Sequence, residues 1–153
     1  MSKIRTFRLA VPVNYDLEWV EAIRRGAPNT LKDSLIWGVS DQFPTDKKGT
    51  AVEKLSVVQF GPSFHHQDAL DYAVSEKKAH IHPRLLWAIG EYHPQLAWEQ
   101  NESWMFLNSG LTCTAGGGVL FPYLRVFGDV FREACVSAVQ FVFDENSWFV
   151  FGE

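Results

Sequence analysis

The last third of the chain constrains the fold most, because apolar and aromatic residues recur there at the spacing of β-strands. From position 103 onward the segments are WMFLN, LTCTA, VLFPYLRVF, ACVSAVQFVF and SWFVFG. Three consecutive glycines, 116–118, separate the second and third segments and predict a hairpin. The turn-forming residues 144–146 predict a second hairpin between the last two segments, in which Phe141 and Phe143 face the core. An unpaired charge at position 141 would then unfold the domain.

Further strands are predicted in the first half of the chain. Residues 5–13 alternate between apolar and polar side chains, which is typical of a half-buried strand. Pro12 donates no ladder hydrogen bond, so this strand lies at a sheet edge or ends there. The segment LSVVQF at 55–60 predicts another strand, and LIWGV at 35–39 predicts a short strand or extended piece.

Three segments have the apolar spacing of amphipathic helices. The first covers 17–25 and ends with two arginines before a glycine, the second covers 67–78, and the third covers 83–92 and begins with a proline. The short connection at 79–82 predicts that the second and third helices pack against each other.

These elements predict one α+β domain over residues 1–153. We expect a mostly antiparallel sheet of about five to seven strands, with two to three helices packed mainly on one face. A chain of 153 residues is long enough to bury a hydrophobic core of this kind.

Charge and hydropathy limit the classes of partner. The net charge of −4 argues against nucleic acid, whose phosphates require concentrated Lys and Arg. Residues 55–153 carry five Lys/Arg against eleven Asp/Glu, so a basic partner would prefer that part of the chain. Neither a membrane span nor a signal-peptide pattern is apparent, so we expect a cytoplasmic protein that does not bind membranes.

All five histidines lie between positions 60 and 98. His80 and His82 stand two positions apart, a spacing at which two imidazoles of an extended segment can share one metal ion. His66 and Asp68 would have to complete the site, yet a helix of about 12 residues separates the two groups by about 18 Å. The alternative is that the histidines serve as helix caps, surface groups or core hydrogen-bonding residues.

The segment from position 98 to 104 predicts a different kind of site. Trp98 and Trp104 flank Glu99 and Glu102, and the segment has neither helical nor strand periodicity. Exposed indoles beside carboxylates would form a partner-binding surface. Buried indoles would instead fix a loop to the core.

Three functional hypotheses follow, and whether the protein is an enzyme stays open. The first is a small soluble binding or interaction protein, similar in composition to acidic inhibitor or immunity proteins, that binds a protein partner or self-associates. The second is a metal-dependent hydrolase that uses the histidines between positions 65 and 82, with a divalent metal as cofactor. The third is a small-molecule binder with an aromatic pocket between sheet and helices. Under the first and third hypotheses the cofactor is unknown.

Overall fold

The computed structural model describes residues 4–96, 103–128 and 131–153. Within them, eight strands form one mostly antiparallel sheet, two more strands form a small sheet, and three α-helices pack on the main sheet. The main sheet contains β1 (Arg5–Asn14), β2 (Thr50–Gln59), β4 (Ala79–His80), β5 (Ser103–Asn108), β6 (Cys113–Ala115), β7 (Gly118–Phe127), β8 (Phe131–Ala138) and β10 (Ser147–Gly152). The small sheet pairs β3 (Phe64–His65) with β9 (Val142–Phe143). The predicted α+β class is confirmed.

The main sheet has the order β1-β2-β10-β5-β7-β6. β10 pairs antiparallel with β2 on one side and parallel with β5 on the other. β4 pairs with the last two residues of β10, and β8 pairs with β7. Among the described strands, β1 pairs only with β2, so its Pro12 lies on an edge strand, as predicted.

The predicted C-terminal hairpin is wrong, because β8 and β10 do not pair with each other. All residues from Ser147 to Phe151 are buried, which is the pattern of a central strand covered on both faces. Phe141 lies between β8 and β9 and is 58% exposed, so the prediction that it faces the core is also wrong. The alternation of apolar and polar residues identified the strands, but it did not identify which strands pair with each other.

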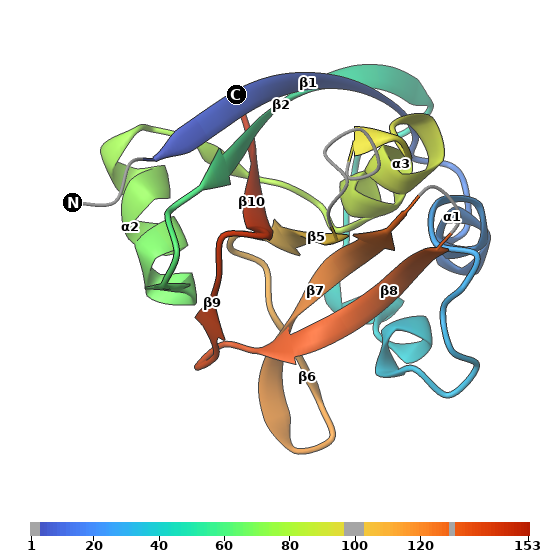
Figure 1. Cartoon of the computed structure of the whole chain (residues 1–153). Helices are drawn as coiled ribbons and strands as arrows, with labels where there is room; N and C mark the ends of the chain where they lie inside the picture. Colours follow the sequence, from blue (N-terminus) through green and yellow to red (C-terminus); the bar gives the residue numbers. More distant parts are fainter. Residues whose placement is uncertain (1–3, 97–102, 129–130) are drawn as a thin grey trace.

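The main sheet curves around α3 (Arg84–Tyr92), as Figure 1 shows, with β1 and β2 arching over one side of the helix and β7 and β8 on the other. Every residue of α3 from Arg84 to Gly90 is buried. α1 (Trp19–Gly26) packs against α3 on the same face. The predicted packing of the second helix against the third is therefore wrong, since α3 pairs with α1.

The second helix, α2 (His66–Ser75), covers the opposite face of the sheet. Side chains of β10 alternate between the two faces: Trp148 and Val150 belong to the core around α3, whereas Phe149 and Phe151 belong to a second core under α2. The second core is rich in phenylalanine and also contains Phe64, Phe121 and Phe143. The helices therefore lie on both faces, two on one and one on the other.

The segment at 35–39, predicted as a short strand or extended piece, instead forms a 3₁₀-helix, η1 (Leu35–Gly38), and a second one, η2 (Ser40–Gln42), follows it. The Ser34 hydroxyl accepts a hydrogen bond from the Ile36 N–H, and the indole of Trp19 donates to the Ile36 carbonyl at 2.8 Å. These contacts satisfy backbone groups that a strand would pair with a neighbour.

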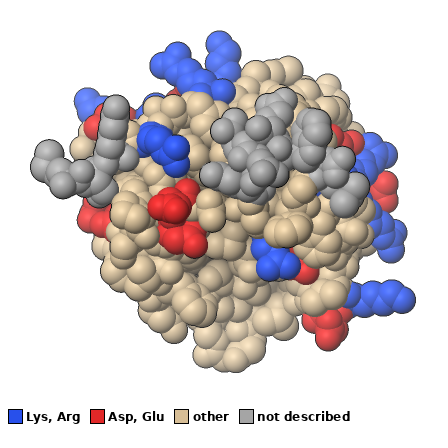
Figure 2. All heavy atoms as spheres, in the orientation of Figure 1, with Lys and Arg blue, Asp and Glu red and all other residues tan. Residues whose placement is uncertain are grey.

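Figure 2 shows positive and negative side chains interspersed over one face of the molecule, with several Lys and Arg side chains along its upper rim. No helix in the described part of the chain has the length and apolar character needed to cross a membrane.

The contact between α1 and α3 yields a stability prediction. A Cβ atom at Gly26 would overlap the backbone of Trp87, and one at Gly90 would overlap the carbonyl of Gly26. We expect Gly26→Ala and Gly90→Ala each to lower the free energy of unfolding by about 1–3 kcal/mol, the usual cost of overpacking, measured by urea denaturation.

Gly38→Ala is the matched control, because a Cβ atom there meets nothing within 4 Å. It should change the free energy of unfolding by less than about 0.5 kcal/mol. Equal effects at all three glycines would contradict the close helix contact.

Candidate functional site

His82 has a structural role at the start of α3. Its Nδ1 accepts a hydrogen bond from the Arg84 N–H at 3.1 Å, and its Nε2 lies 2.6 Å from the Phe43 carbonyl. Since Nδ1 accepts, Nε2 carries the proton and donates to Phe43. Neither ring nitrogen of His82 keeps a lone pair for a metal ion, and the imidazole instead ties the loop at Phe43 to the helix.

His66 is part of the aromatic core under α2. It is 5% exposed, and its ring stacks on Phe121 with a centroid separation of 4.8 Å. Its Nε2 is buried without a hydrogen-bond partner in the described structure. Asp68, on the first turn of α2, accepts the His65 N–H at 2.7 Å, as a helix-capping residue does.

The metal site predicted from the sequence consists of His80, His82, His66 and Asp68. In the described ranges, no three His, Cys, Asp or Glu side chains are placed to hold a metal ion. His82 is a capping residue and His66 a core residue, which is the alternative that the sequence left open.

His80 has one ring nitrogen engaged and one left for a ligand. Its Nδ1 lies 3.0 Å from the hydroxyl of the fully buried Ser109. The backbone of Gly110 lies so close to the imidazole that a Cβ at that position would overlap the ring. The ring is therefore held in one orientation, with Nε2 as its remaining polar atom.

The turn that holds His80 is itself fixed by Asn108, which is fully buried. The amide of Asn108 donates to the Ile81 carbonyl at 3.1 Å, and its oxygen accepts the N–H groups of Gly110 and Leu111 at 3.2 and 3.0 Å. One side chain thus connects the end of β5 to the segment that carries His80.

His80 lines a pocket of about 290 Å³, which we call the His80 pocket. Its polar wall includes Tyr15, Lys47 and Glu53: the Tyr15 hydroxyl donates to Glu53 at 2.8 Å, and the Lys47 ammonium lies 3.3 Å from the same carboxylate oxygen. Burial and the adjacent Glu53 carboxylate raise the pKa of Tyr15, so its hydroxyl stays protonated. The remaining lining residues are Pro44, Thr45, Lys54, Leu55, Ala79, Ile81, His82, Leu85, Leu111, Gly152 and Glu153.

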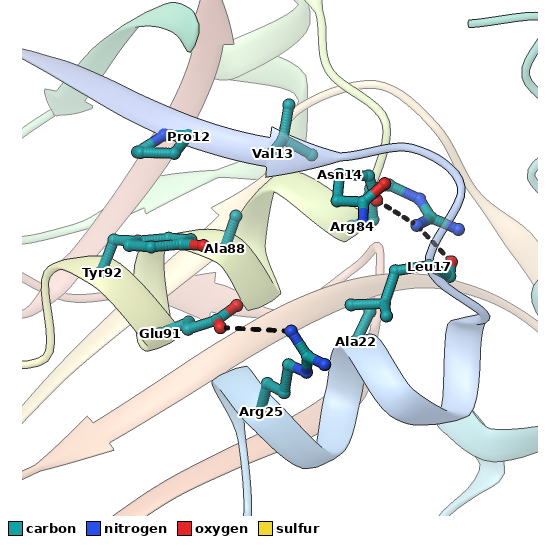
Figure 3. Close-up of a pocket in the computed structure, with 10 residues that line it drawn as sticks. All are labelled: Pro12, Val13, Asn14, Leu17, Ala22, Arg25, Arg84, Ala88, Glu91 and Tyr92. Carbon is teal, nitrogen blue, oxygen red and sulfur yellow. Dashed lines mark hydrogen bonds and ion pairs between the residues drawn. The ribbon is translucent and has the colours of Figure 1, made fainter. Parts of the chain in front are cut away.

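Arg84 binds the backbone next to Tyr15, and the close-up in Figure 3 shows its side chain with Asn14 and Leu17. Its guanidinium donates from Nη1 to the carbonyls of Asn14 and Leu17, at 3.1 and 2.6 Å, and so fixes the turn that carries Tyr15. The hollow beside it measures about 30 Å³, which is room for about one water molecule and not for a ligand. Arg84 is therefore a positioning residue for both Tyr15 and His82.

The predicted partner surface is not supported at its one described residue. Trp104 is 6% exposed and packs on Trp148 with ring centroids 4.8 Å apart, so its indole belongs to the core. For this ring the structure therefore has the buried alternative, and the expectation that at least one of the two indoles is exposed stays a prediction. Trp98, Glu99 and Glu102 lie outside the described residues.

Sequence analysis found His80 but missed the residues that make it a site. Tyr15, Lys47 and Glu53 come from three separate segments, and Asn108 and Ser109 from a fourth. The one signal for this turn in the sequence is the pair Asn108 and Ser109, at and just after the end of the apolar segment WMFLN. A strand that ends in Asn and Ser often enters a hydrogen-bonded turn.

Comparison of the chain with protein-family models, with curated proteins and with solved structures gave no match.

The role of Asn108 can be measured. We expect Asn108→Ala to lower the free energy of unfolding by about 2–4 kcal/mol, because three backbone groups, among them the buried Ile81 carbonyl, lose their partner. Asn146→Ala is the control, since that side chain makes no hydrogen bond within the described residues, and should cost less than about 0.5 kcal/mol. A near-neutral Asn108→Ala in urea denaturation would contradict the proposed connection.

The buried His66 and the half-buried His82 predict how stability depends on pH. Burial lowers the pKa of His66, and the nearby His80 lowers it further. Burial also lowers the pKa of His82, against the opposing effect of its hydrogen bond to Phe43. At pH values between these lowered pKa values and about 6.5, the unfolded chain binds protons that the folded protein does not.

The free energy of unfolding should therefore be largest above about pH 6.5 and fall as the pH decreases below it. His66→Phe keeps the aromatic stacking and removes the titrating group, so its stability should depend less on pH. His93→Phe, at a half-buried position outside both cores, is the control. Urea denaturation across this pH range tests the prediction, and an identical slope in His66→Phe and the wild type would contradict it.

Proposed function

We propose that the protein binds a small polar molecule in the His80 pocket. The observation that carries the proposal is the fixed imidazole of His80, whose Nδ1 is occupied by Ser109 and whose Nε2 remains for a ligand. The volume of about 290 Å³ is close to the lower end of typical ligand pockets, at about 300 Å³.

The charges of the pocket support a hydrophilic ligand with both hydrogen-bond donors and acceptors. Lys47 and Lys54 supply two positive groups, and Glu53 and Glu153 supply two negative ones. Glu53 already binds Tyr15 and Lys47, so its carboxylate is oriented before a ligand arrives. Such preorganisation lowers the entropic cost of binding.

This proposal modifies the third sequence hypothesis, since the pocket is polar and not aromatic. The metal-dependent hydrolase has less support, because His82 and His66 are engaged elsewhere. Binding of a protein partner stays a separate hypothesis, whose predicted surface is buried at Trp104 and otherwise lies outside the described residues.

A thermal-shift screen tests the proposal with four compound classes: amino acids, sugars, carboxylic acids and phosphate esters. A compound at about 100 times its Kd should stabilise the protein by about 2.7 kcal/mol. His80→Ala should abolish this shift, and so should Gly110→Ala, whose methyl group displaces the imidazole.

His93→Ala is the matched control, because His93 is hydrogen-bonded to the Ala10 carbonyl away from the pocket. It should retain the full ligand-induced shift. A compound that stabilises His80→Ala and Gly110→Ala as strongly as the wild type would contradict the proposed site, as would a screen in which no class has any effect.

A further inference from the structure

We propose that a groove between the end of β2 and α2 is the docking site for a lysine-rich segment of a partner protein. The groove measures about 420 Å³ and is separate from the His80 pocket. Its lining consists of aromatic, acidic and small polar residues, together with one exposed aliphatic residue: Ile4, Phe60, Ser63, Phe64, Asp68, Asp71, Tyr72 and Ser75.

Two aromatic rings form the wall of this groove. Phe60 and Tyr72 have centroids 5.2 Å apart and ring planes at 83°, and both are half-buried. Phe64 lies beneath them, with its centroid 5.5 Å from that of Phe60. Rings set nearly at right angles let a cation contact one ring face within about 6 Å while its methylene stem packs on the other.

The acidic residues supply the complementary charge. Asp68 and Asp71 lie one turn apart on α2, and both are exposed. Asp68 accepts the His65 N–H, and Asp71 accepts the Gln67 side-chain amide, so neither is paired with a cation in the described structure. The lining described here contains neither Lys nor Arg, and its net charge is therefore negative.

The surroundings of the groove favour a protein segment as the occupant. Ile4 in the lining is 47% exposed, and Val74, three positions after Asp71 on α2, is 82% exposed. A peptide chain can cover these apolar side chains while it places a lysine against the carboxylates. The charge balance of residues 55–153 also favours a basic partner.

The test titrates ¹⁵N-labelled protein with a ten-residue lysine peptide, at low and at high salt. We expect the NMR signals of Phe60, Asp71 and Tyr72 to shift, and the affinity to decrease as salt screens the charges. Asp71→Asn should weaken binding about two- to fivefold, the effect of one exposed ion pair. Tyr72→Leu should weaken it as well, through loss of the ring.

Two controls make the test specific. Asp33→Asn, in the loop between α1 and η1, which contributes no residue to the groove, should bind like the wild type. The same peptide with every lysine acetylated should not bind. If Tyr72→Leu fails to fold, Asp71→Asn at its exposed position still decides the outcome.

Three results would overturn the proposal. These are unchanged affinity in Asp71→Asn, signal shifts confined to other surfaces, and equally tight binding of tetramethylammonium, which would indicate a site for small ammonium compounds. Loss of peptide binding leaves the His80 pocket untouched, so the two proposals fail independently.

Discussion

The burial of both faces of β10 is the constraint on which the rest of the structure depends. Trp148 and Val150 pack toward α3, and Phe149 and Phe151 pack toward α2. A strand without a polar face cannot lie at the surface without exposing large aromatic rings, so the chain supplies a helix layer on each side. The central position of β10, the curvature of the sheet around α3, and the separate core under α2 all follow from this requirement.

The His80 pocket lies where the pairing of β10 changes. One edge of β10 pairs with β5 as far as Asn108 and then with β4 at His80. The turn after β5 therefore meets β4 side by side, and Asn108 and Ser109 join the two by side-chain hydrogen bonds. The change of pairing partner from β5 to β4 places the imidazole of His80 at the sheet surface, opposite the Glu53 carboxylate of β2.

The two proposed sites use different chemistry on the two sides of the same sheet region. The His80 pocket is lined by groups of both charges, of which Lys47 and Glu53 are already paired, and this suits a small polar molecule. The groove along α2 has carboxylates without a cationic partner in the described part of the chain, beside aromatic rings, which suits a cation. The hypothesis of a binding protein thus rests on surfaces other than the segment from Trp98 to Trp104.

The helices, most strands and the α+β class were predictable from local sequence, because periodicity reports which side chains share a face. Periodicity does not report which strands pair, so the partners of β10 and the exposed position of Phe141 came only from the tertiary structure. The same holds for His80 and His82, which are alike in sequence. Ser109, 29 positions away, orients His80, whereas Phe43, 39 positions away, binds His82. Local sequence carries no information on contacts at such separations, and those contacts decide which imidazole remains for a ligand.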